Sequence, residues 1–148
     1  MTTQQTTAAN VALVRSSLDA FNEGDIDACV ALLSPGFVMN MAGLPPRHGP
    51  DVWRQGAQII KRGFPDLRAH IDDVVAAGDQ VALRLTFHGT HQGEFLGLPA
   101  TGRTIEYASY EFYRIADGLF IEEWICSDTA TLQAQLAGGD PWAPSPTG

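Results

Sequence analysis

Two glutamates in the C-terminal half of the chain are the residues best suited to acid–base chemistry. Glu111 and Glu123 lie in two stretches of alternating apolar residues, which residues 116–118 join as a predicted β-hairpin. A three-residue loop with a left-handed glycine pairs Ile115 with Leu119 and therefore places Glu111 opposite Glu123. Two carboxylates opposed in a partly dry site repel each other, so one should keep its proton at neutral pH. Such a pair could donate one proton and accept another.

The same pair has a second interpretation, which the sequence leaves open. Both carboxylates could lie at a wet rim, or Arg84 or Arg47 could neutralise them, because perturbed carboxylate pairs mark functional sites only statistically. The register matters as well, since a slip of one residue in the hairpin would exchange the cross-strand partners.

The hairpin also decides which side chains share a face of the sheet. Besides the two glutamates, one face carries Tyr107, Ser109, Tyr113, Ile121 and Ile125. The opposite face carries Tyr110, Phe112, Phe120, Trp124 and Cys126. Since both faces hold large apolar side chains, neither can be left wholly to water. We expect one face to line a pocket, where Tyr107, Ser109 and Ile125 contact the substrate. The other is expected to pack on a second sheet, which a homodimer would supply most simply.

Four further polar residues are candidates for the site. Asp128 precedes a predicted helix, where it could be an N-cap or an acid. Asp66 follows a proline at a strand entrance and could be a turn residue or point into the mouth of the pocket. His91 lies in a glycine-rich loop, where it could bond to the backbone or take part in catalysis, and His48 is a candidate of the same kind.

Four large apolar residues are candidates for the wall and lid of the pocket. Trp53, Phe64, Phe95 and Leu96 would suit stacking on a flat polycyclic substrate. Ordinary core packing explains the same residue types equally well, so the sequence leaves both interpretations open.

The elements that must position these residues change in type along the chain. Helical spacing of apolar residues dominates the first half, and alternation with a period of two follows it. The predicted helices cover residues 11–21, 26–33, 51–63 and 129–136, and the predicted strands cover 37–41, 67–77, 81–88, 103–115 and 119–127. Helices first and an antiparallel meander afterwards predict one α+β domain with an ordered core over about residues 8–137. The ends, residues 1–7 and 138–148, are expected to be tails.

Composition and missing motifs exclude several classes of partner. The 148-residue chain has a formal net charge of −8, whereas nucleic acids and anionic membranes attract a basic face. Motifs for metal binding, serine hydrolysis and dinucleotide binding are missing, so we expect no metal and no cofactor. Two cysteines without a C-x-x-C motif, and an N-terminus without a signal-peptide pattern, favour the cytoplasm. No apolar run is long enough to span a bilayer.

A long glycine-rich motif relates the chain to a known family. Residues 89–102 read G-T-H-Q-G-E-F-L-G-L-P-A-T-G, a stretch similar to the SnoaL-like polyketide cyclase family. The resemblance extends to Phe21-Asn22-Glu23-Gly24-Asp25, Phe64-Pro65-Asp66-Leu67, Trp124-x-x-x-Asp128 and Gly139-Asp140-Pro141-Trp142. It implies a cone in which a curved antiparallel sheet and N-terminal helices enclose an apolar pocket. It also implies small aromatic polyketides of the anthracycline kind as substrates, and chemistry without metal, flavin or nicotinamide.

The chain departs from the cyclases of this family at their catalytic positions. The cyclases' acid/base aspartate aligns with Ile125, a pocket glutamine with Ser109 and a pocket histidine with Glu111, and the nearest aspartate is Asp128. The resemblance therefore favours the hydroxylase-type members, in which a carbanion or a hydroquinone would react with oxygen while carboxylates move protons. A separate reductase could prepare that substrate. Intramolecular aldol cyclisation is the second hypothesis, and a non-catalytic ligand-binding module is the third.

Overall fold

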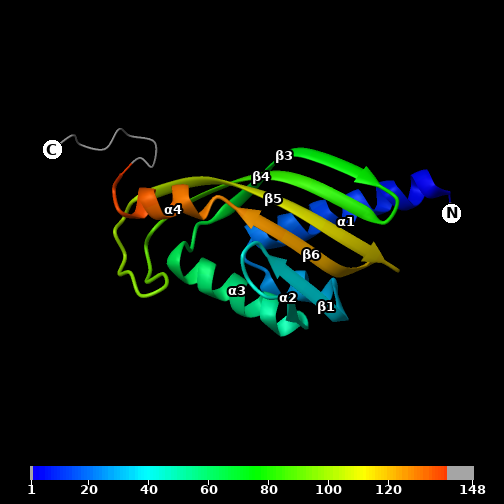
Figure 1. Ribbon diagram of the computed structural model, residues 1–148, viewed down its shortest axis with the longest axis horizontal. Coiled ribbons are helices and arrows are strands. Elements are labelled where there is room, and N and C mark those ends of the chain that lie inside the picture. Colours follow the sequence, from blue (N-terminus) through cyan, green and yellow to red (C-terminus); the bar gives the residue numbers. More distant parts are fainter. Residues whose placement is uncertain (1, 140–148) are drawn as a thin grey trace.

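A computed structural model of the chain describes residues 2–139. In it, helices from the N-terminal half of the chain cover one face of a curved sheet (Figure 1). The helices are α1 (Thr3–Asn22), α2 (Ile26–Ala31), α3 (Pro50–Gly63) and α4 (Thr129–Leu136). The strands are β1 (Leu33–Met41), β2 (Arg47–His48), β3 (Arg68–Ala77), β4 (Gln80–Thr90), β5 (Thr104–Ala116) and β6 (Leu119–Ser127). All predicted elements are present, β6 and α4 with the predicted ends and the others with shifted ends. The α+β class is confirmed, and β2 is the strand that the sequence pattern did not reveal.

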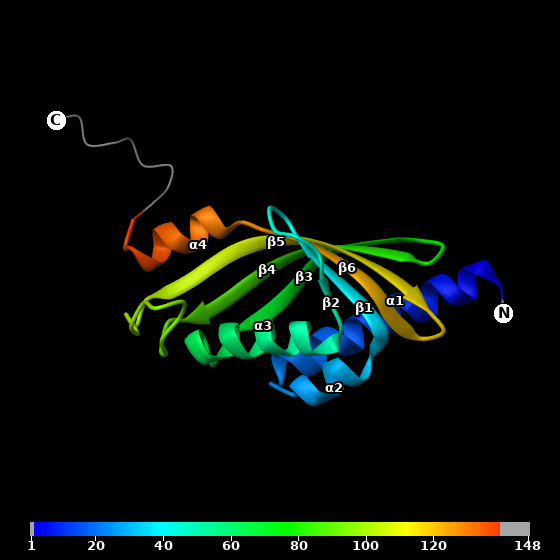
Figure 2. The same cartoon turned by 60° about the horizontal axis from the view of Figure 1, so that its bottom comes forward.

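The six strands form an open sheet in the order β2-β1-β6-β5-β4-β3. The sheet arches over α1, α2 and α3, whereas α4 lies beyond the end of β6 (Figure 2). Neighbouring strands are antiparallel except β1 and β6, which are parallel. The predicted antiparallel meander is confirmed for β3 to β6, and the parallel β1–β6 pair is a feature that the sequence pattern did not reveal. A parallel pair needs a long crossover connection, and the chain between β1 and β6 supplies one.

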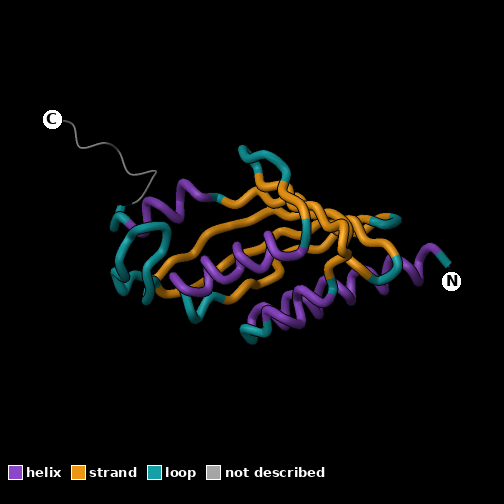
Figure 3. The backbone as a smooth tube through the Cα atoms, turned by 90° about the horizontal axis from the view of Figure 1, so that it is seen from below, coloured by secondary structure: helices purple, strands orange, loops and turns teal. Residues whose placement is uncertain are grey.

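Two clusters of buried apolar side chains fill the space between the sheet and the helices. One is built around Phe21, Phe64 and Leu67, and the other around Phe37 and Leu85. From the helical side, α1 and α3 cross in front of the strands (Figure 3). In that arrangement α1 packs on β3 and β4, and α3 packs on β1. The helices and the sheet can therefore enclose a cavity between them.

The N-terminal segment is more ordered than its composition suggests. Residues 3–7, which were expected to be part of a tail, form the first turns of α1. The Thr2 side chain accepts a hydrogen bond from the Gln5 backbone at 3.1 Å, and the Gln5 side chain accepts one from the Thr2 backbone at 2.7 Å. This capping box stabilises the helix start. The predicted C-terminal tail lies outside the described residues beyond residue 139. Among residues 2–139, no helix is long and apolar enough to cross a membrane.

The register of the β5–β6 hairpin differs from the predicted one by two residues. Ala116 pairs with Leu119, so the loop contains only Asp117 and Gly118, whose φ angles of 52° and 73° suit a tight hairpin turn. A bulge then leaves Ile121 unpaired between two ladder positions. The shorter loop and the bulge each shift the pairing by one residue.

The corrected register changes partners but mostly keeps the faces. Glu111 pairs with Ile125 and Glu123 with Tyr113, so the glutamates are not directly opposed. Because side chains alternate with a period of two, a shift of two residues leaves both glutamates on one face. The exception is at the bulge, where Phe120 is buried on the inner face instead of the outer one.

Candidate active site

A cavity of about 210 Å³ lies between the inner face of the sheet and helices α1, α2 and α3. Its wall is mainly apolar, with contributions from Leu18, Phe21, Cys29, Leu33, Phe37, Met39, Met41, Ala57, Ile60, Leu67, Phe87 and Phe120. The ionisable or hydroxyl groups on the same wall are concentrated on β5 and β6: Tyr107, Glu111, Tyr113, Glu123 and Ser127. An apolar cavity with a few convergent polar groups is typical of a small-molecule site.

The two glutamates are buried in this cavity and share one tyrosine. Glu111 and Glu123 are only 6% and 3% exposed. The Tyr113 hydroxyl donates a hydrogen bond to Glu111 Oε2, and it also interacts with the Glu123 carboxyl group. The tyrosine therefore bridges the two acids in a site with little access to water.

The surroundings of the two acids differ, and the difference assigns the proton. Burial raises the pKa of Glu111, while hydrogen bonds from Tyr113 and Ser109 act in the opposite direction. Burial and the nearby charge of Glu111 together raise the pKa of Glu123 well above its usual value. Because Glu111 receives two donors and Glu123 feels the charge of its neighbour, the arrangement favours an ionised Glu111 and a protonated Glu123.

The neighbouring tyrosines stay neutral in the same environment. Burial and the charges of the two glutamates raise the pKa of Tyr113, and burial followed by the charge of Glu111 raises that of Tyr107. Tyr107 also stacks on Phe87 at a centroid distance of 5.2 Å. Both phenols can therefore donate hydrogen bonds from the cavity wall.

Neither arginine reaches the carboxylates. Arg84 lies on the exposed face, where it forms an ion pair with Asp73 at 2.8 Å. Arg47 is exposed in β2, on the rim of the sheet. The structure therefore excludes the alternative in which Glu111 and Glu123 lie at a wet rim or are neutralised by an arginine. Within residues 2–139, no three His, Cys, Asp or Glu side chains gather as metal ligands.

A pair of serines continues the polar group on one side of Glu111. Ser109 is buried, and its hydroxyl donates to Glu111 Oε1 at 3.1 Å. Its oxygen also lies 2.9 Å from the hydroxyl oxygen of Ser127, its cross-strand partner. Ser127 lines the cavity, whereas Ser109 lies behind the wall, so the expected direct contact of Ser109 with substrate is not what the geometry provides.

The candidates for the wall and lid separate into two groups. Trp53 and Ile125 line the cavity, as does Tyr107. Phe64 is fully buried in the core against Phe95, at a centroid distance of 5.0 Å, and neither reaches the cavity wall. Leu96 is 75% exposed in a loop and does not reach it either.

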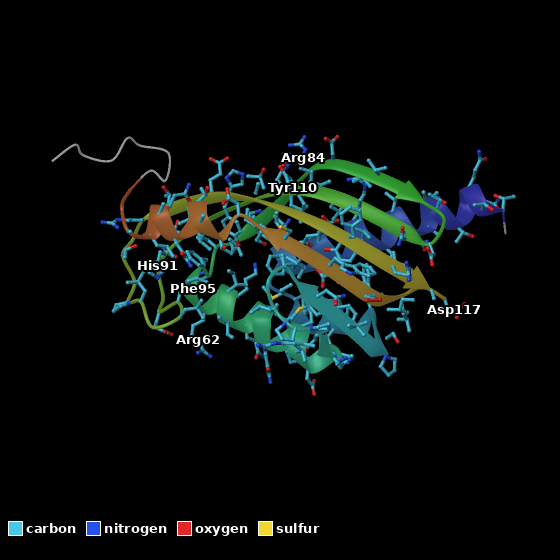
Figure 4. All side chains as sticks on the ribbon, viewed as in Figure 1. Arg62, Arg84, His91, Phe95, Tyr110 and Asp117 are labelled. Atoms are coloured by element: carbon cyan, nitrogen blue, oxygen red, sulfur yellow. The ribbon has the colours of Figure 1, made fainter. Side chains whose placement is uncertain are left out.

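The loop that follows β4 is anchored to the end of α3 by close packing. Gly93 approaches so closely that an added Cβ would lie 2.0 Å from the Arg62 carbonyl oxygen, which only glycine tolerates. Figure 4 shows His91 and Phe95 together at this end of the molecule, near Arg62. His91 is fully buried, and its Nδ1 accepts the Thr101 backbone N–H at 3.2 Å. In this structure His91 orders the loop and does not line the cavity.

The remaining polar candidates lie outside the cavity. Asp128 caps α4 by accepting hydrogen bonds from the Thr131 backbone at 3.1 Å and hydroxyl at 2.6 Å, which lower its pKa. Asp66 binds the Thr90 backbone at 2.7 Å, and hydrogen bonds outweigh burial to lower its pKa. His48 is exposed in β2. The positions of Asp66 and Asp128 follow from these local turn and capping hydrogen bonds, which satisfy both carboxylates outside the cavity.

Among the polar groups that β5 and β6 bring to the cavity wall, Tyr113 and Ser127 are the ones that sequence reasoning did not select. Alternation places Tyr113 on the face of Glu111, and that signal was sufficient to propose it. Ser127 was harder to find, because its contact with Ser109 depends on the turn length and the bulge.

Comparison with known proteins gives a family and several relatives of similar length. The family model described as SnoaL-like polyketide cyclase matches residues 11–136. The chain is 28% identical over 148 residues to aklanonic acid methyl ester cyclase DnrD of Streptomyces peucetius, covering 95% of this chain and 97% of that protein. It is 29% identical over 143 residues to aklanonic acid methyl ester cyclase DauD of Streptomyces sp. (strain C5), covering 92% and 84%.

Solved structures of similar proteins have the same fold. AclR of Streptomyces galilaeus, a proposed hydroxylase, superposes with a TM-score of 0.83 at 29% identity, covering 89% of this chain and 98% of that one. IdmH of Streptomyces antibioticus, a proposed polyketide cyclase, superposes with a TM-score of 0.77 at 34% identity, covering 86% and 98%.

Proposed function

Because the chain belongs to the SnoaL-like polyketide cyclase family, we propose that it closes a ring of an anthracycline-type polyketide by an intramolecular aldol reaction. That it is a polyketide-tailoring enzyme of cyclase or hydroxylase type follows from the family and its relatives. The observation that carries the finer proposal is the buried Glu111–Tyr113–Glu123 group, which supplies a base and an acid in one cavity.

The proposed reaction uses the two acids in opposite roles. Ionised Glu111 removes a proton from a carbon next to a carbonyl group, and the electron pair stays on the substrate as an enolate. The enolate carbon attacks a second carbonyl carbon, and protonated Glu123 gives its proton to the alkoxide that forms. Tyr113 then returns the proton from Glu111 to Glu123 by accepting one proton and donating another. Each positioned acid or base of this kind contributes about 10²–10⁴-fold to a rate.

The relatives change the order of the two reactions expected from the sequence. Relatives similar over nearly the whole chain are named as ring-closing enzymes that act on aklanonic acid methyl ester, which supports cyclisation. Hydroxylation is the second candidate, since the AclR structure is similar and the family resemblance implies that Ile125 stands where the cyclases have their aspartate. The carboxylate pair meets the demand for an acid/base from other positions, so the loss of that aspartate does not argue against aldol chemistry.

One pair of incubations separates the two reactions. With aklanonic acid methyl ester, the proposal predicts a ring-closed isomer and no consumption of oxygen. A hydroxylated product formed from a closed tetracycle, with oxygen consumed and a reductant or reductase required, would assign the hydroxylase instead. Tight binding of both compounds without any turnover would assign a non-catalytic binding module.

Variants of the two acids test the mechanism. Glu111→Gln and Glu123→Gln should each lower kcat by about 10²-fold or more, because each removes one positioned proton-transfer group. Glu106→Gln is the matched control, since Glu106 is exposed on β5 outside the cavity. Unchanged kcat in both cavity variants would refute the carboxylate mechanism.

The outer face of the sheet supports a homodimer as part of the same proposal. Tyr110 and Phe112 are 54% and 53% exposed there, and Cys126 is exposed beside them. Figure 4 shows Tyr110 and Arg84 on the side of the sheet away from α3. Covering this apolar surface with a second copy would remove it from water. Sedimentation of the wild type as a dimer and of Phe112→Asp as a monomer is expected, and a monomeric wild type would contradict it.

A further inference from the structure

The serine pair beside Glu111 has a geometry that the proposed proton transfers do not use. Ser109 touches Glu111 at 3.1 Å on one side and Ser127 at 2.9 Å on the other. Of the two hydroxyls, only that of Ser127 reaches the cavity wall. Ser109 thus connects Glu111, the base of the reaction, to the Ser127 hydroxyl, which can contact substrate, whereas Ser109 itself has no contact with the cavity.

The direction of these hydrogen bonds depends on the proton on Glu111. A serine hydroxyl has one proton to donate, and an ionised carboxylate can only accept. When Glu111 is ionised, Ser109 donates to it and accepts from Ser127, so Ser127 presents lone pairs to the cavity. When Glu111 is protonated on Oε1, it can donate to Ser109, Ser109 donates to Ser127, and the Ser127 proton is free to turn into the cavity.

We propose that Ser127 is the hydrogen-bond donor to the enolate oxygen, and that Ser109 is the positioning residue that turns this donor on when Glu111 takes the substrate proton. The inference rests on the proposed aldol function. The substrate C–H bond breaks, an O–H bond forms on Glu111, and the electron pair remains on the substrate as the enolate. No proton passes along the serines; their hydroxyls reorient. Loss of the proton from Glu111 restores the first orientation.

The spacing of the groups suits an α carbon and its carbonyl oxygen. Ser109 Oγ lies 3.1 Å from Glu111 Oε1 and 2.9 Å from Ser127 Oγ, so the Glu111 and Ser127 oxygens are no more than about 6 Å apart. An α carbon and its carbonyl oxygen can contact both groups across that separation, the carbon at Glu111 and the oxygen at Ser127.

This device stabilises the enolate without stabilising the ground-state ketone. Before proton transfer, the carbonyl oxygen meets the lone pairs of Ser127, and afterwards the enolate oxygen meets a donor. Interactions that appear only as charge develops raise kcat and leave KM nearly unchanged. Removal of one such donor from an oxyanion site costs about 10²–10³ in kcat.

The test compares single and double serine variants in the ring-closure assay. Ser127→Ala and Ser109→Ala should each lower kcat by about 10²-fold with KM within about twofold. The double variant should match the single variants, because the two hydroxyls act as one unit. Ser109→Thr, which keeps the hydroxyl, should restore most of kcat. The proposal would be overturned if the kcat loss of the double variant were the product of the two single losses. It would also be overturned if the variants raised KM and left kcat unchanged.

A binding measurement tests the same inference without turnover. 2-Naphthol can give its proton to ionised Glu111, which turns the Ser127 donor on and leaves the negative charge on the naphthol oxygen, as in an enolate; naphthalene lacks the oxygen. Both serine variants should bind 2-naphthol at least tenfold more weakly than wild type and bind naphthalene equally well. Equal loss for both probes would show a change of cavity shape and would overturn the proposal.

Two outcomes keep this inference separate from the proposed function. A wild type that closes no ring refutes the aldol function, and with it this role of the serines. A wild type that closes the ring, with both serine variants at wild-type kcat, refutes the serine inference alone. Ser34→Ala is the control for folding, because the Ser34 hydroxyl also accepts one hydrogen bond, from Gly36 at 3.2 Å, outside the cavity.

Discussion

Removal of the Tyr113 hydroxyl tests the claim that Glu111 is held ready as the ionised base. This hydroxyl donates to Glu111 where water has little access, and a hydrogen bond to a charged group contributes about 1.5–3 kcal/mol. Loss of that energy disfavours ionised Glu111 by a factor of about 10–150 at a given pH. Tyr113→Phe should therefore lower kcat by up to that factor near neutral pH, because less of the enzyme carries the ionised base.

The pH dependence of kcat identifies the cause of the loss. A base must be ionised, so activity falls as the pH drops through the pKa of Glu111, which burial already raises. Without the Tyr113 donor this pKa rises further, and the acid limb of the kcat profile moves to higher pH. Tyr110→Phe is the matched control, since it removes the same atom from the exposed face of β5. A lower kcat with an unmoved acid limb would refute the assignment of Glu111 as the base that Tyr113 holds ionised.

Three further changes have definite expected results. Glu123→Gln should raise Tm relative to wild type at pH 8 but not at pH 4, as measured by thermal unfolding at both pH values. Burial raises the pKa of Glu123 in the folded protein, so the wild type loses stability as the pH rises above the unfolded-state pKa of about 4.3, and glutamine removes that loss. An equal Tm difference at both pH values would contradict this. Ile125→Asp places a third carboxylate opposite Glu111 and should lower Tm, more at pH 8 than at pH 5, and a pH-independent change would argue against a buried charge. Asp128→Ala removes the cap that binds Thr131 and should destabilise the fold by about 0.5–2 kcal/mol in chemical denaturation, with kcat unchanged; a large loss of kcat would give Asp128 a catalytic role.

The faces of the hairpin could be predicted from the sequence, whereas its register could not. Alternation alone puts Glu111, Tyr113 and Glu123 on one side of the sheet for any shift of the hairpin register by an even number of residues. The two-residue turn and the bulge at Ile121 each move the pairing by one residue, and together they preserve the face. A bulge does not change the alternation of side chains in the partner strand, so the Ser109–Ser127 contact could not be predicted from the sequence.

The residues of the family motifs predicted the fold correctly but not the site. His91, Asp66 and Leu96 belong to segments that identify the family, yet none of them lines the cavity. Their positions are fixed by local bonds, such as that between Asp66 and Thr90, and by the packing of the loop on α3. A motif can therefore report the fold correctly while its polar residues serve the backbone.

Glu111 and Glu123 should hold one proton between them at neutral pH. Carbon-13 spectra of the glutamate carboxyl groups, assigned with Glu111→Gln and Glu123→Gln, measure this directly. We expect one protonated and one ionised buried carboxyl group at pH 7, with the proton mainly on Glu123 and the two groups titrating as a coupled pair. Two fully ionised carboxylates at pH 7 would contradict it.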